Sequence, residues 1–137
     1  MMARILIIED NHANTKLAEL LLRKAGHTVL CASDAETGVA LTREARPDLV
    51  LMDIQLPGMD GLAATALLKR DPATAAIPVI ALTALAMKDD EERSVLAGCD
   101  AYMAKPLRYQ QLYLAIDTLL AKAGSSAGTA ARTEEVT

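Results

Sequence analysis

Leu-Val-Leu-Met-Asp-Ile-Gln-Leu-Pro is the sequence of residues 49–57, and it decides the fold. It opens with four apolar residues in a row, without alternation of apolar and polar side chains. Such a run is typical of a strand buried on both faces of a parallel sheet. The run ends at Asp53, and Pro57-Gly58 begins a stiff turn shortly after it. The stretch therefore predicts a buried strand with a carboxylate at its carboxyl end.

Similar short apolar runs lie on both sides of this strand along the chain, separated by longer amphipathic stretches. The predicted strands are residues 4–8, 28–32, 49–52, 79–82 and 101–103. The predicted helices are a segment over residues 17–25 that Gly26 ends, followed by 35–45, 62–70, 88–97 and 108–122. Five strand–helix units in series predict a doubly wound α/β domain, with one parallel sheet and helices on both faces.

Length and composition indicate one domain and exclude several classes of partner. The 137 residues fit a single domain at residues 1–122, and the Gly-, Ser- and Thr-rich residues 123–137 predict a disordered tail. A net charge of −4 lacks the basic surface expected for nucleic-acid binding. No apolar run reaches the roughly 20 residues of a membrane span, so we expect no membrane contact. Two cysteines outside any metal or disulfide pattern favour a cytoplasmic protein.

Charged and polar residues follow four of the five predicted strands. Glu9 and Asp10 follow the first strand, Asp53 the third, Thr83 the fourth and Lys105 the fifth. In a doubly wound sheet the ligand site lies beyond these carboxyl ends. Three adjacent carboxylates repel one another unless a cation joins them, and oxygen ligands of this kind suit Mg²⁺. A lysine and a hydroxyl can hold phosphoryl oxygens, so the pattern indicates a phosphoryl group with a carboxylate nucleophile, Asp53.

Each of these residues also has a simpler structural interpretation. Glu9 and Asp10 can complement the positive end of a helix dipole, Thr83 can cap a helix, and Lys105 can be a solvated surface charge. Their shared placement at the strand ends favours a site. The Lys105-Pro106 bond is a candidate cis peptide; the alternative is a trans proline that starts the last helix.

In combination, these motifs resemble the receiver domain of bacterial two-component response regulators. They are Glu9-Asp10-Asn11, Met52-Asp53-Ile54-Gln55-Leu56-Pro57, Thr83-Ala84 and Lys105-Pro106, and the resemblance covers residues 4–122. It implies a flavodoxin-like sheet with strand order 2-1-3-4-5 and five helices. Within the family the chain most resembles DivK-like regulators of the cell cycle and cell polarity, a similarity that Gly98-Cys99-Asp100-Ala101-Tyr102 also carries.

The resemblance implies a phosphoacceptor switch rather than an enzyme. Asp53 would take a phosphoryl group from a histidine kinase or a histidine phosphotransferase, and kinases are also candidate output targets. The other implied roles are Mg²⁺ binding by Glu9, Asp10, Asp53 and the Gln55 backbone carbonyl, phosphoryl binding by Thr83 and Lys105, and switching by Tyr102. Gln55 and Leu85 stand where receivers tune dephosphorylation, and apolar Leu85 predicts slow self-dephosphorylation. The protein would be a monomer or a weak, phosphorylation-dependent dimer.

Two other functions are compatible with the same residues. A haloacid-dehalogenase-like phosphohydrolase also forms an aspartyl-phosphate, but it needs a second acid where Gln55 stands. A binding module that no longer accepts phosphate would keep the fold without the chemistry.

Overall fold

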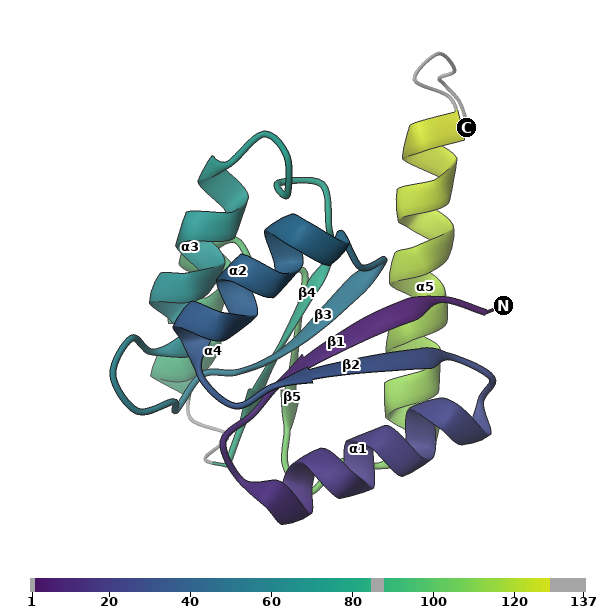
Figure 1. Ribbon diagram of the computed structural model, residues 1–137, viewed down its shortest axis with the longest axis horizontal. Helices are drawn as coiled ribbons and strands as arrows, with labels where there is room; N and C mark the ends of the chain where they lie inside the picture. The colour runs from purple at the N-terminus through teal and green to yellow at the C-terminus, as the bar shows by residue number, and fades with distance from the viewer. Residues whose placement is uncertain (1, 85–87, 129–137) are drawn as a thin grey trace.

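A computed structural model describes residues 2–84 and 88–128, and over these residues the chain forms a five-stranded parallel sheet with five helices (Figure 1). The strand order is β2-β1-β3-β4-β5. The strands are β1 (Arg4–Ile8), β2 (Thr28–Ala32), β3 (Leu49–Asp53), β4 (Val79–Thr83) and β5 (Ala101–Ala104). The helices are α1 (His12–Lys24), α2 (Ala35–Ala45), α3 (Gly61–Arg70), α4 (Lys88–Ala97) and α5 (Tyr109–Gly128). The predicted fold class and strand order are confirmed.

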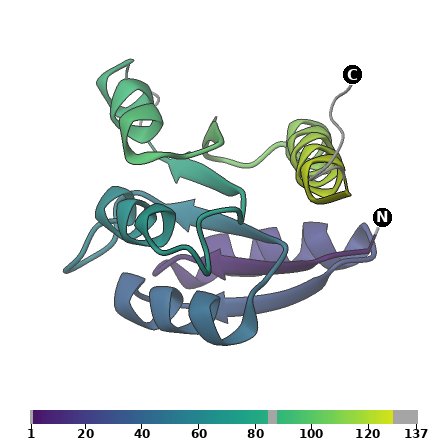
Figure 2. The ribbon, with the colours of Figure 1, turned by 90° about the horizontal axis from the view of Figure 1, so that it is seen from above.

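The sheet separates two layers of helices, and each layer covers its own apolar core. Helices α1 and α5 lie on one face, whereas α2, α3 and α4 lie on the other (Figure 2). Successive residues of β1 point to opposite faces, as the period of a strand requires. Ile7 accordingly packs with Leu22 of α1 and Ile116 of α5, whereas Ile8 packs with Val39 of α2. Burial of β1 on both faces explains why its sequence is continuously apolar.

Helix ends follow from capping side chains and glycines. Asn11 caps α1 by accepting a hydrogen bond from the Asn14 backbone N–H at 3.0 Å. Asp34 caps α2 by accepting a hydrogen bond from the Thr37 backbone N–H at 2.7 Å. Gly26 follows the end of α1 with φ +94°, a conformation that glycine adopts without a steric penalty.

The last helix differs from its predicted end. It extends to Gly128, beyond the end predicted at residue 122. Once a helix has formed, each added residue contributes a hydrogen bond, and Ala123 is a strong helix former. Residues 129–137 lie outside the described part of the chain, and their predicted disorder stays a prediction.

Two tertiary contacts connect segments that are distant in the sequence. The Tyr113 hydroxyl on α5 donates to the Leu21 carbonyl on α1 at 2.7 Å. On the other face of the sheet, the Lys69 ammonium donates to the Ile77 carbonyl at 2.8 Å and pairs with Asp100 at 2.9 Å.

None of the described helices is both long and apolar enough to span a bilayer.

Candidate functional site

The carboxyl ends of the strands bring the predicted residues together at one edge of the sheet. Glu9 and Asp10 directly follow β1, and Asp53 is the last residue of β3. One carboxylate oxygen from each of these three residues lies within 4.8 Å of the others. Glu9 and Asp53 are buried, whereas Asp10 is exposed to solvent. The predicted carboxylate cluster therefore forms, with one side open to water.

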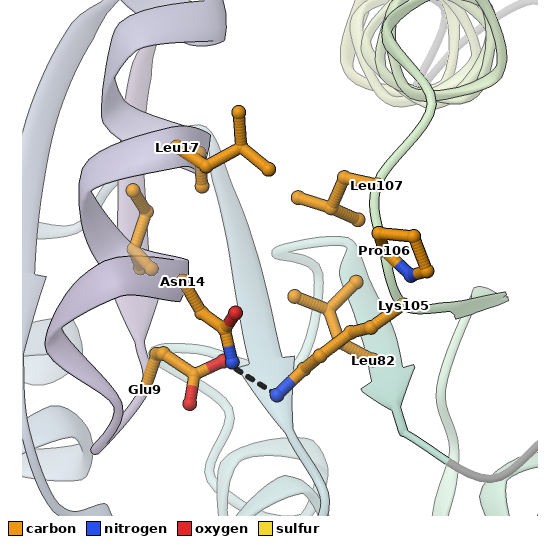
Figure 3. Close-up of a pocket in the computed structure, with 9 residues that line it drawn as sticks. Glu9, Asn14, Leu17, Leu82, Lys105, Pro106 and Leu107 are labelled. Carbon is orange, nitrogen blue, oxygen red and sulfur yellow. Dashed lines mark ion pairs between the residues drawn. The ribbon is translucent and has the colours of Figure 1, made fainter.

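Lys105, which directly follows β5, supplies positive charge to this cluster. Its ammonium lies 2.6 Å from a Glu9 carboxylate oxygen, the pair drawn in Figure 3, and 3.2 Å from Asp53 Oδ2. Its side chain is only 14% exposed. Burial by itself would lower the pKa of Lys105, but hydrogen bonding to Glu9 and the charge of Asp53 outweigh burial and raise it. The ammonium therefore stays protonated and can neutralise negative charge in the site.

The Glu9 carboxylate is held from both sides. Its Oε2 accepts a hydrogen bond from the Asn11 backbone N–H at 3.1 Å, while Oε1 faces Lys105. Burial, followed by the nearby Asp53 carboxylate, raises the pKa of Glu9 against the opposing effects of Lys105 and the Asn11 N–H. A divalent cation among the carboxylates would relieve this repulsion. Metal binding is the site role that the sequence predicts for Glu9, and its ion pair with Lys105 was not predicted.

The donor set of the cluster fits Mg²⁺. All its side-chain ligand atoms are carboxylate oxygens, which a hard cation prefers. The exposed position of Asp10 leaves room for the water ligands that Mg²⁺ retains. Glu9, Asp10 and Asp53 are the residues that would hold the ion.

The Asp53 side chain is oriented by the loop that follows it. Asp53 Oδ1 accepts a hydrogen bond from the Gln55 backbone N–H at 2.9 Å, and Oδ2 faces Lys105. The Gln55 side chain is exposed. Thr83 is fully buried at the end of β4, and its carbonyl accepts a hydrogen bond from the Lys105 backbone N–H at 2.7 Å. The structure thus places Thr83 next to the strand end that carries Lys105.

Tyr102, another predicted site residue, lies outside this cluster. Tyr102 on β5 is half-buried and packs against an apolar group formed by Ile54, Leu62 and Ala81. Leu85 falls in residues 85–87, outside the described residues. The Lys105-Pro106 peptide is cis.

A small pocket adjoins the Glu9–Lys105 pair between α1 and the segment that leads into α5. Asn14 and Leu17 line it from α1, and Pro106 and Leu107 line it from the opposite side (Figure 3). Apart from Asn14 and the ion pair at its end, the pocket is lined by apolar side chains. It lies beside the carboxylate cluster and therefore belongs to the surroundings of the same site.

Gly61, the first residue of α3, lies directly against the backbone of Asp53 and Ile54 and is not among the site residues predicted from the sequence. It is buried, and its backbone N–H donates to the Ile54 carbonyl at 3.2 Å. The sequence contains no signal of this contact, because Gly61 stands just before the predicted helix at residues 62–70, where glycine is common in turns.

Comparisons with known proteins identify similar chains over nearly the whole length. A family model described as "response regulator receiver domain" matches residues 5–117. The chain is 44% identical over 119 residues to the polar-differentiation response regulator DivK of Brucella anthropi, covering 87% of this chain and 97% of that protein. It is 42% identical over 123 residues to DivK of Brucella ovis, covering 90% and 100%.

Solved structures give the same result. The receiver domain of a sensor histidine kinase from Pseudomonas aeruginosa PAO1 superposes with a TM-score of 0.82 and is 33% identical, covering 88% of this chain and 99% of that one. That structure has a magnesium ion coordinated in its active site cleft. A CheY-like receiver domain protein from Methanospirillum hungatei JF-1 superposes with a TM-score of 0.84 at 28% identity, covering 92% and 99%.

Proposed function

Since the chain belongs to the response regulator receiver domain family, whose members are phosphoacceptor switches, we propose that Asp53 receives a phosphoryl group from the phosphohistidine of a histidine kinase or phosphotransferase. The observation that carries this proposal is the position of the Asp53 carboxylate. It is almost fully buried, 3.2 Å from the Lys105 ammonium, and in a cluster with Glu9 and Asp10. A carboxylate oxygen thus faces positive charge where a phosphoryl group would arrive.

The transfer needs positioning and charge neutralisation more than covalent machinery. An Asp53 carboxylate oxygen attacks phosphorus, and the bond from phosphorus to the histidine nitrogen of the donor breaks. The bonding electron pair stays on the imidazole nitrogen, and the product is an acyl phosphate on Asp53. When bound, Mg²⁺ supplies charge neutralisation at the phosphoryl oxygens. Lys105 supplies a further positive charge, and the Thr83 hydroxyl supplies a hydrogen-bond donor.

We propose that phosphorylation also changes the partners of Lys105 and Tyr102. A phosphoryl dianion beside Lys105 offers its ammonium a more highly charged acceptor than Glu9, so the ammonium would turn toward the phosphoryl oxygens. Movement of Thr83 toward the phosphoryl group would give Tyr102 space to turn inward. The half-buried position of Tyr102 supports this role, because the ring already packs against the apolar side chains of Ile54 and Ala81.

Output then passes through protein contacts on α4, β5 and α5. Among the described residues, four large side chains with apolar surface are exposed there: Val95 at 67%, Leu96 at 87%, Tyr109 at 55% and Leu114 at 70%. Exposed apolar side chains of this size are suitable contacts for a partner. The similarity to DivK supports kinases of a cell-polarity or cell-cycle pathway as donors and output targets. We place the switch in the cytoplasm, in keeping with the free thiols of Cys31 and Cys99.

The phosphorylated form should be long-lived without a partner. Gln55 has an exposed amide next to the site, whereas Leu85 offers no hydrogen bond to orient an attacking water. A half-life of minutes or longer for the acyl phosphate would support this, and one of seconds would contradict it.

Intact-mass spectrometry with acetyl phosphate and Mg²⁺ tests the proposed function. The wild type should gain the mass of one phosphoryl group, and chelation of Mg²⁺ with EDTA should prevent the gain. Asp53→Asn is the matched variant, because it keeps the shape of the side chain but loses its nucleophilic charge. An equal gain in both proteins would exclude Asp53 as the acceptor.

A further inference from the structure

We infer that Gly61 is a positioning residue for Asp53: its lack of a side chain allows the first turn of α3 to lie directly against the backbone of the phosphoacceptor. This inference rests on the proposed function and deepens it. It concerns the position of the Asp53 backbone, which the side-chain contacts within the carboxylate cluster do not determine.

The contact between Gly61 and Asp53 is a contact between backbones. A Cβ atom placed on Gly61 would overlap the Asp53 carbonyl oxygen, and it would lie 2.8 Å from both the Asp53 carbonyl carbon and the Ile54 Cα. Ordinary contacts between carbon atoms are about 3.5–4.0 Å long. Either α3 or the end of β3 would therefore have to move by roughly 1 Å to accommodate even alanine.

Both sides of this contact are held in place. On the strand side, the Ile54 N–H donates to the Leu82 carbonyl at 3.0 Å, which ties the chain after Asp53 to β4. On the helix side, Asp60 caps α3 by accepting from the Ala63 N–H at 2.8 Å. The Gly61 N–H closes the intervening loop by donating to the Ile54 carbonyl. The start of α3 is thus a fixed support against which the Asp53 peptide rests.

Further packing keeps α3 from retreating. Leu62, Ala64 and Leu68 of α3 are buried against the sheet. The Thr65 hydroxyl donates to the Gly61 carbonyl at 2.8 Å. A side chain at position 61 would therefore displace the Asp53 backbone at least in part, and the Asp53 carboxylate with it. The Gln55 N–H that orients this carboxylate would move as well, because it lies two residues further on.

Small displacements of a reacting group have large effects on transfer rates. A misplacement of about 1 Å costs on the order of 100-fold in rate. Substitution of a residue that holds a metal ligand in position typically reduces metal affinity by about 10- to 100-fold. We therefore expect Gly61→Ala to lower the maximal phosphorylation rate by about 100-fold and the Mg²⁺ affinity by about 10-fold.

Gly38→Ala provides a matched control. A Cβ at Gly38 in α2 would also be too close to its neighbours, lying 2.7 Å from Ile8 Cγ1, but its three nearest atoms belong to the Ile8 side chain and not to the backbone. This substitution introduces similar crowding without touching the backbone of a site residue. Both variants should lose stability, whereas only Gly61→Ala should lose phosphorylation rate and Mg²⁺ affinity.

The experiment measures four quantities for the wild type, Gly61→Ala and Gly38→Ala. These are the thermal unfolding midpoint, the Mg²⁺ dissociation constant, and the maximal rate and half-saturating concentration for acetyl phosphate, determined well below the unfolding midpoint. Loss of rate and Mg²⁺ affinity in folded Gly61→Ala, beyond any loss in Gly38→Ala, supports the inference. Wild-type values in folded Gly61→Ala overturn it, because α3 would then absorb the side chain without moving Asp53.

Two outcomes need separate readouts. If the wild type accepts no phosphoryl group, the proposed function fails, and Mg²⁺ affinity alone decides the role of Gly61. If Gly61→Ala does not fold, Asp60→Ala replaces it, since loss of an N-cap costs only about 1 kcal/mol. This variant loosens the same support, and a phosphorylation rate equal to that of the wild type would overturn the inference.

Discussion

Replacing Lys105 with methionine should destabilise the protein strongly in the absence of Mg²⁺ and only weakly in its presence. Methionine keeps the length and apolar stem of the side chain but removes the ammonium that lies 2.6 Å from Glu9 and 3.2 Å from Asp53. The Glu9 and Asp53 side chains are 2% and 3% exposed, so solvent screens their charges poorly. The expected loss of stability is therefore that of a buried ion pair and not that of a surface ion pair.

The size of the effect follows from this burial. Removing one partner of a buried ion pair costs about 3–5 kcal/mol, because the other charge is left uncompensated. Asp10 keeps one side of the cluster open to water, so we expect the lower end, about 3 kcal/mol. For a domain of this length that corresponds to a decrease of about 10 °C in the unfolding midpoint.

Mg²⁺ should reverse most of this loss. A ligand that binds only the folded state stabilises more when it binds more tightly, so at saturating Mg²⁺ each tenfold decrease in the dissociation constant of the variant removes about 1.4 kcal/mol of its loss relative to the wild type. The Lys105 ammonium competes with Mg²⁺ for the same carboxylates, so the Lys105→Met variant should bind Mg²⁺ more tightly than the wild type. Its gain in stability at a given Mg²⁺ concentration should therefore exceed the gain of the wild type.

Urea unfolding followed by far-UV circular dichroism, with EDTA or with millimolar Mg²⁺, measures both effects. Lys16→Met is a matched control, because Lys16 is an exposed lysine of α1. It should change stability by less than about 0.5 kcal/mol under either condition. An equal loss in Lys105→Met with and without Mg²⁺, or a loss no larger than that of Lys16→Met, would refute the reasoning.

Three further predictions concern the scaffold. Burial lowers the pKa of His27, so the unfolded chain binds a proton before the folded protein does as the pH falls below about 6.5. The free energy of unfolding should therefore decrease as the pH falls through this range, and urea unfolding of His27→Asn should show a smaller decrease. Lys69→Met removes the donor to the Ile77 carbonyl and the partner of Asp100, and should cost about 2 kcal/mol in the same assay, whereas a loss below 0.5 kcal/mol would argue against these contacts. Tyr113→Phe removes the hydroxyl that links α5 to α1 and should lower the free energy of unfolding by about 1 kcal/mol, so an unchanged value would count against that hydrogen bond.

The strands and the convergence of the site could be predicted because both follow from local patterns. Residues 4–8 are continuously apolar and form β1 with the expected bounds. Strands β3 and β4 each extend one residue further, to Asp53 and Thr83, because backbone pairing continues through a polar side chain. Parallel strands end at a common edge, so residues at their carboxyl ends had to lie together.

Contacts between distant segments could not be predicted in this way. The close contact between the Asp53 backbone and Gly61 depends on the path of the loop between β3 and α3, which the composition of the loop does not determine. The Glu9–Lys105 pair depends on side-chain conformations at two different strand ends. The Tyr113–Leu21 hydrogen bond joins residues 92 positions apart. Periodicity describes the faces of single elements and says nothing of such pairings.

The most direct test of the central claim is to locate the phosphoryl group on the chain. The protein is phosphorylated by a histidine kinase or phosphotransferase carrying phosphohistidine, with Mg²⁺ present, and the acyl phosphate is then reduced with borohydride, which converts a phosphorylated aspartate to homoserine. Peptide mass spectrometry should find this conversion at residue 53 in the wild type and no conversion in Asp53→Asn. Reduction of Glu9, Asp10 or another carboxylate to the corresponding alcohol, with Asp53 unchanged, would contradict the account.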